Sequence, residues 1–199
     1  DRVLKTVMEL GGNAPFLVFD DADIGKAVEG AMVAKMRHSA ETCTAANRFI
    51  VQRSVADEFA RRVTARVDAM KIGRGTEDGV TIGPLIDDRA VAKADELVTD
   101  AVARGADLRT GGKPVDGPGT FYLPTVLSDV QPGSDILREE IFGPVLAIVP
   151  FDDEDEAIRL AAHEPDAVLL ADRGLSPMDL VSGRDYLWRD MQQAHHGAA

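Results

Sequence analysis

The chain holds a single cysteine, Cys43, among its 199 residues. One thiol cannot form a disulfide within a chain, and such sparse use of cysteine is typical of proteins kept in a reducing compartment. No apolar run approaches the roughly 20 residues that a transmembrane helix requires. The first residues lack the apolar core of a signal peptide. These absences predict a cytoplasmic protein that does not span a membrane.

Basic residues are in the minority. The 22 lysines and arginines face 34 aspartates and glutamates, which leaves a net charge of −12 at pH 7. A surface of this sign repels the phosphates of nucleic acids and of anionic lipids. We therefore expect neither nucleic acid nor a membrane as a partner. A small anionic substrate is still possible, because a single well-placed arginine is enough to bind it.

Several common site motifs are missing as well. There is no G-x-G-x-x-G fingerprint, no P-loop, no H-E-x-x-H, no C-x-x-C and no G-x-S-x-G, so the usual short signatures of dinucleotide, nucleotide, zinc and serine-hydrolase sites are absent. The four histidines are scattered apart from one adjacent pair near the C-terminus. We predict no metal site, because metal ligands come in closely spaced sets.

Apolar periodicity indicates alternating strands and helices. Strands are expected over residues 15–20, 48–52, 121–126 and 145–151, and helices over residues 21–37, 54–70, 88–104 and 153–163. Asp21 or Asp23 is expected to cap the first helix and Ser54 the second. This alternation is typical of an α/β fold with a largely parallel sheet and flanking helices. The strand–helix rhythm ends after about Ala162.

Cys43 lies in a polar loop that follows the first predicted helix. A lone cysteine is most often a small buried hydrophobic residue. Here, however, its neighbours are polar, and the nearby Arg37 and Arg48 favour the thiolate, which is the nucleophilic form. Glu41 opposes the thiolate if its side chain turns inward. The sequence leaves a catalytic and a structural cysteine both open at this point.

Two glutamates occupy unusual local settings. Glu9 sits in an apolar stretch before a Gly-Gly turn, where a carboxylate is suited to act as a general base near neutral pH; a solvated strand end is the alternative. Glu140 precedes Ile141 and Phe142. It is either the acidic end of a helix or an acceptor for sugar hydroxyls, as acidic residues are in dinucleotide sites, with Phe142 as a packing surface.

Together these segments resemble the aldehyde dehydrogenase superfamily. Residues 9–15 (ELGGNAP) are similar to its general-base motif, residues 37–43 (RHSAETC) to its nucleophile motif, and residues 139–145 (EEIFGPV) to its cofactor-ribose motif. Residues 83–86 and 121–126 resemble further landmarks, in the same order and at similar spacing. The resemblance covers residues 1–162 and is strongest to succinate-semialdehyde dehydrogenases. It implies the α/β catalytic domain of that fold.

The resemblance also implies roles for individual residues. Cys43 would attack the aldehyde carbon and Glu9 would activate the water that hydrolyses the thioester. With NAD or NADP as hydride acceptor, Glu140 would hold the nicotinamide ribose, while Phe142 and Leu10 would lie near the nicotinamide. Arg37 would pair with the distal carboxylate of a semialdehyde acid, because a guanidinium fork suits a carboxylate. Full-length relatives are expected to be homo-oligomeric.

The chain departs from the family's usual residues at three positions, and two alternative functions stay open. The family usually has Gly-Gln where this chain has Ala40 and Glu41, and often Asn at the position of His38. Residues 1–12 would be the end of a cofactor domain that is otherwise largely missing, and residues 163–199 form a divergent tail. The chain is accordingly expected to be an aldehyde-oxidising enzyme segment. The alternatives are an inactive, non-enzymatic fragment and a residual thiol esterase.

Overall fold

The computed structural model describes residues 11–162 of the chain. Its centre is a five-stranded sheet in the order β1-β2-β5-β4-β3. The strands are β1 (Ala14–Val18), β2 (Ala46–Gln52), β3 (Asp107–Thr110), β4 (Thr125–Ser128) and β5 (Val145–Phe151). β1 pairs with β2, and β4 with β5, in parallel, whereas β3 is antiparallel to β4. The predicted α/β fold with a mostly parallel sheet is therefore confirmed for this part of the chain.

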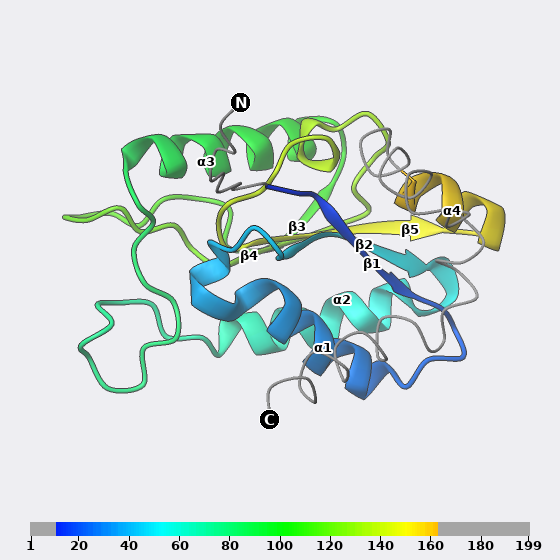
Figure 1. Cartoon of the computed structure of the whole chain (residues 1–199), viewed down its shortest axis with the longest axis horizontal. Helices are drawn as coiled ribbons and strands as arrows, with labels where there is room; N and C mark the ends of the chain where they lie inside the picture. The colour runs from blue at the N-terminus through cyan, green and yellow to red at the C-terminus, as the bar shows by residue number, and fades with distance from the viewer. Residues whose placement is uncertain (1–10, 163–199) are drawn as a thin grey trace, which may run out of the picture. The chain divides into compact units, whose positions relative to one another are not determined.

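Helices α1 (Ile24–Met36) and α2 (Arg53–Asp68) lie on one face of the sheet and α3 (Asp88–Ala103) on the other (Figure 1). The core between the sheet and the first two helices is made of buried apolar side chains. Its members include Val28, Ala31, Met32, Phe49, Phe59, Val63, Val126, Leu146 and Ile148. Phe49 is fully buried, with its ring centroid 5.3 Å from that of Phe16 and 6.5 Å from that of Phe59.

The helix starts follow local chemistry. Asp23 caps α1 by accepting a hydrogen bond from the Lys26 amide, and Asp87 caps α3 by accepting one from Ala90. Each satisfies a backbone donor that the first turn leaves unpaired. The predicted cap at Ser54 is wrong. α2 begins at Arg53, directly after β2, and its N-cap Gln52 makes no side-chain capping bond.

Two strand predictions need correction. β3 was not expected from the sequence, and β4 begins at Thr125 rather than at residue 121. β3 is a four-residue edge strand with three exposed positions, so it carries little of the apolar signal that marks a buried strand. The residues before β4 form only an isolated bridge, between Pro114 and Tyr122.

The chain divides into two compact units, Asp1–Pro150 and Phe151–Ala199. The helix described in the second unit is α4 (Glu154–Ala161), whose N-cap Asp153 accepts a hydrogen bond from the Glu156 amide at 2.8 Å. Three acidic residues in its first turn complement the positive end of the helix dipole. Within residues 11–162, no helix is long and apolar enough to cross a membrane.

Candidate active site

The backbone turns sharply between α1 and the cysteine. A short 3-10 element, η1 (Arg37–Ala40), follows α1 directly, and His38, Ser39 and Ala40 have φ angles of 51°, 58° and 64°. These values lie in the left-handed region, which side chains with a Cβ rarely occupy. Three such residues in succession reverse the chain and leave Cys43 exposed ahead of β2. The family's usual glycine at position 40 matches this geometry better than Ala40 does.

Replacing Ala40 with glycine is expected to stabilise the chain by about 1 kcal/mol, because glycine adopts a positive φ without steric cost. Ala92→Gly, at an exposed interior position of α3, serves as the control and should destabilise by about the same amount, since glycine weakens a regular helix. Urea unfolding midpoints of the two variants measure both effects. A lower midpoint for Ala40→Gly would contradict the strain described here.

Side chains from the turn hold the loop at residues 83–86. The Gly83 amide donates to Ser39 Oγ at 2.8 Å, and the Ile86 amide donates to Glu41 Oε1 at 3.0 Å. Glu41 was expected to disfavour the thiolate if it turned inward. Its carboxylate instead accepts a backbone hydrogen bond from a neighbouring loop, so the family's Gln at this position is replaced by another acceptor. Two hydrogen bonds thus join the nucleophile motif, residues 37–43, to the loop at residues 83–86.

Gly12 lies next to both the Cys43 loop and the Glu140 carboxylate. Its amide donates to Glu140 Oε1 at 3.2 Å, and a Cβ built on Gly12 would lie 3.6 Å from the Cys43 carbonyl oxygen. A Cβ on Gly11 would lie only 2.3 Å from Glu140 Oε2, so a side chain at this position would have to displace the Glu140 carboxylate. The structure places two of the three predicted motifs, 128 residues apart, in direct contact.

A buried lysine that was not predicted from the sequence lies behind this contact. Lys35, on α1, donates to Asn47 Oδ1 at 2.6 Å and to the Ile141 carbonyl at 3.0 Å. Asn47 Nδ2 in turn donates to the Gly12 carbonyl at 3.1 Å. A signal for Lys35 was present, because it falls four residues after Ala31 and three after Met32 on the apolar stripe of α1. A lysine on a buried face needs polar partners.

The remaining predicted residues do not take part in the contact between Gly12 and Glu140. Arg37 is the exposed C-cap of α1, and Phe142 is 43% exposed next to Ile141. Arg48, expected to favour the thiolate, donates through Nε to the Asn13 carbonyl at 2.8 Å. Glu9 and Leu10 lie outside the described residues, so their assigned roles stay predictions.

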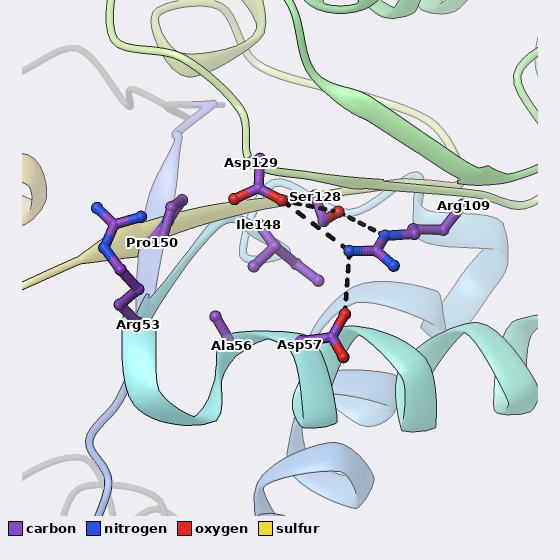
Figure 2. Close-up of a pocket in the computed structure, with 8 residues that line it drawn as sticks. All are labelled: Arg53, Ala56, Asp57, Arg109, Ser128, Asp129, Ile148 and Pro150. Carbon is purple, nitrogen blue, oxygen red and sulfur yellow. Dashed lines mark hydrogen bonds and ion pairs between the residues drawn. The ribbon is translucent and has the colours of Figure 1, made fainter.

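The candidate residues gather where the strands begin. Gly12 lies two residues before β1, Cys43 three residues before β2, and Glu140 five residues before β5. A pocket of about 210 Å³ lies instead where strands end (Figure 2), lined in part by Arg53, Ser128 and Pro150. In it Arg109 donates to Ser128 Oγ at 2.6 Å and to Asp57 at 3.2 Å. None of the candidate residues lines this pocket.

The described residues also bear on the metal prediction. Among residues 11–162, no group of three or more His, Cys, Asp and Glu side chains could hold a metal ion. The absence of a metal site from the whole chain stays a prediction, because three of the four histidines, His163, His195 and His196, lie outside the described residues.

Comparison with known proteins decides the family. The model of the aldehyde dehydrogenase family matches residues 1–166. The chain belongs to the aldehyde dehydrogenase family. Among relatives of this aldehyde dehydrogenase segment, the succinate-semialdehyde dehydrogenase of Paenarthrobacter nicotinovorans is 58% identical over 160 residues, which cover 80% of the chain and 36% of the relative. The mitochondrial succinate-semialdehyde dehydrogenase of Rattus norvegicus is 41% identical over 198 residues, covering 99% of the chain and 36% of the relative.

Solved structures of the family agree with this result. The crystal structure of an Escherichia coli NADP-dependent enzyme aligns with a TM-score of 0.75 and 43% identity, covering 84% of the chain and 37% of that structure. A Staphylococcus aureus betaine aldehyde dehydrogenase in complex with NAD+ aligns with a TM-score of 0.71 and 37% identity, covering 77% and 31%. The chain thus spans about a third of the length of its relatives. It is similar to that segment of them, and the resemblance read from the sequence is confirmed.

Proposed function

We propose that the chain is the catalytic segment of a dehydrogenase that oxidises succinate semialdehyde to a carboxylate with NAD+ or NADP+. The observation that carries the proposal is the meeting of the Cys43 loop and the Glu140 carboxylate on Gly12. Hydride transfer requires the nucleophile and the group that holds the nicotinamide ribose to lie in the same part of the molecule, and Gly12 adjoins both segments. The names of several relatives, succinate- and glutarate-semialdehyde dehydrogenases among them, support the substrate class.

In the proposed reaction, the Cys43 thiolate attacks the aldehyde carbon, and its sulfur forms a thiohemiacetal with that carbon. No side chain of the protein can accept a hydride; a bound nicotinamide would accept the hydride that leaves this carbon. The resulting thioester is hydrolysed by a water molecule that Glu9 deprotonates, which frees Cys43 and releases the acid. The exposure of Cys43 suits the first of these steps, since an aldehyde reaches it from solvent.

The residues before β5 fit a nucleotide ribose. Glu140 is partly exposed, and its carboxylate already receives one backbone hydrogen bond, from Gly12. An ionised carboxylate offers about four acceptor sites, so it can also receive ribose hydroxyls. Phe142 presents 43% of its surface for packing against the nicotinamide, and Leu10 would contact the ring through its backbone. The printed names of relatives support both cofactors, since one Escherichia coli relative is an NADP(+) enzyme and one structure holds NAD+.

The exposed guanidinium of Arg37, six residues before the nucleophile, is proposed to bind the distal carboxylate of the semialdehyde. A small-molecule aldehyde, rather than nucleic acid or membrane, is the proposed partner of this acidic chain, and homo-oligomers are proposed for its full-length relatives. A cytoplasmic location stays a prediction, because the rat and rice relatives are named as mitochondrial.

The proposal is tested by supplying the purified chain with succinate semialdehyde and either NAD+ or NADP+, and following nicotinamide reduction. We expect reduction that requires the aldehyde, at a low rate, because the chain covers only about a third of the length of its relatives. Butyraldehyde is the matched control, since it has the same carbon chain without the carboxylate, and it should be oxidised more slowly if Arg37 acts as proposed.

A second candidate, a thiol esterase, is favoured by the exposure of Cys43, because ester cleavage needs a nucleophile but no dinucleotide. Cleavage of p-nitrophenyl acetate without any nicotinamide reduction would replace the dehydrogenase proposal with this one. The absence of both activities would leave a fragment without enzymatic function.

A further inference from the structure

Lys35 is buried to an unusual degree for a charged residue. Its side chain has 0% exposure, although it belongs to a helix whose other lysine, Lys26, is largely exposed. Burying an ammonium costs free energy unless it is paired and hydrogen-bonded. The partners supplied here are the Asn47 amide oxygen and the Ile141 carbonyl oxygen. Because burying Lys35 costs free energy and the residue lies beside a candidate active site, we looked for a functional role for it.

The contacts of Lys35 close a ring around the site. Lys35 binds Asn47, Asn47 binds the Gly12 carbonyl, the Gly12 amide binds Glu140, and Glu140 is covalently joined to Ile141, which binds Lys35 again. The ring links helix α1, strand β2, the Gly-Gly turn and the loop before β5. Both polar groups of the Gly12 backbone are used within it. The Glu140 carboxylate is thus connected to Lys35 through Gly12 and Asn47.

Two opposing effects set the pKa of the Lys35 ammonium. Burial lowers the pKa of the ammonium from 10.5 to about 7, and the negative charge of Glu140 partly opposes this by raising it. The other groups that face Lys35, the Asn47 side chain and the Ile141 carbonyl, do not titrate. Cys43 and Arg48 are the further ionisable groups around the Gly12 turn. A lysine with this pKa is partly deprotonated near neutral pH.

We propose that Lys35 is a positioning residue that holds the Glu140 carboxylate against Gly12, and that loss of its proton loosens this carboxylate and weakens the binding of the cofactor ribose. The inference rests on the proposed role of Glu140 in the dehydrogenase. A charged donor binds an oxygen more strongly than a neutral one does, so deprotonation weakens two links of the ring at once. Cofactor binding in this segment then becomes sensitive to pH through a residue that does not touch the cofactor.

The first test is independent of activity and uses the 199-residue chain with isotope-labelled lysine and glycine. Nuclear magnetic resonance should detect one lysine that titrates near pH 7 and that disappears in Lys35→Met. The Gly12 amide resonance should shift with the same midpoint. Lys26→Met is the matched control on the same helix, and it should leave both titrations unchanged.

A second variant keeps the test decisive if Lys35→Met does not fold. Glu140→Gln removes the charge that supports the ammonium, so it should move the Lys35 midpoint to lower pH. A Lys35 that titrates in the ordinary lysine range, or a Gly12 amide that does not follow it, would overturn the proposal whatever the catalytic activity of the chain.

The second test asks whether the ring acts on the cofactor. In the dehydrogenase assay, the KM for the nicotinamide cofactor should rise roughly tenfold between pH 6 and pH 8, the effect of weakening about one charge-assisted hydrogen bond. Lys35→Met should have a high KM at both pH values, and Lys26→Met should behave like the parent. A purely structural lysine would give variants that differ in thermal stability but share the parent's pH profile, and that outcome would count against a positioning role. Should no nicotinamide reduction occur at all, the dehydrogenase proposal fails while the resonance test still decides the role of Lys35.

Discussion

Cys43→Ala is expected to lower aldehyde oxidation and activated-ester cleavage by about 10³-fold or more, because both reactions need a covalent nucleophile and removing one leaves only binding and electrostatic contributions. The chain has no second cysteine to take over. The exposure of Cys43 predicts that the loss is chemical rather than structural, since exposed substitutions usually change stability by less than about 0.5 kcal/mol.

Thr44→Ala is the matched control for this variant. Thr44 is the exposed neighbour of Cys43, and its replacement should change either rate by no more than about twofold. Titration with a thiol reagent should find one reactive group in the folded parent and none in Cys43→Ala. Retention of full activity by Cys43→Ala would remove the nucleophile from the proposed mechanism.

Phe49→Ala is expected to destabilise the first unit by about 3–5 kcal/mol, the usual loss when a large aromatic side chain is deleted from a close-packed core. Phe49 is 0% exposed and packs between Phe16 of β1 and Phe59 of α2. Its deletion removes aromatic contacts on both sides and leaves a cavity. Domains are typically stable by only 5–15 kcal/mol, so this variant should unfold at a much lower urea concentration.

Phe142→Ala provides the same chemical change at a surface position. Because Phe142 is 43% exposed, its loss should cost clearly less stability than the loss of the fully buried Phe49, while the proposed packing against nicotinamide should raise the KM for the cofactor. Equal destabilisation by the two substitutions would contradict the core described here. The pair therefore separates a residue that holds the fold from one that is offered to a ligand.

The segments with strong local signals were predictable. The helix α1 followed from a regular apolar stripe, and its cap at Asp23 was one of the two aspartates expected there. β5 was predicted with its observed bounds because its side chains are nearly all buried. β3 was not predictable, because it is an exposed edge strand whose pairing with β4 decides its structure. The start of α2 was misplaced for a similar reason, since Arg53 follows β2 without a side-chain cap.

The functional motifs were also readable from the sequence, because Cys43, Glu9 and Glu140 stand in segments whose residue types match those of the aldehyde dehydrogenase family. Their arrangement was not readable. The contact between Gly12 and Glu140 joins residues 128 positions apart, and no local pattern encodes such a distance. Glu41 was judged by its charge alone, whereas the fold gives its carboxylate a backbone partner at Ile86.

The sequence by itself determined the family, the mostly parallel α/β character and the chemical types available for a thiol-dependent oxidation. It did so because apolar periodicity and short motifs are local properties of the chain. Tertiary structure alone decided that these motifs meet at the amino ends of β1, β2 and β5, and that Lys35 is buried behind them. Burial and long-range hydrogen bonds arise only when distant segments pack together. They remove Lys35 from solvent and lower the pKa of its ammonium to about 7.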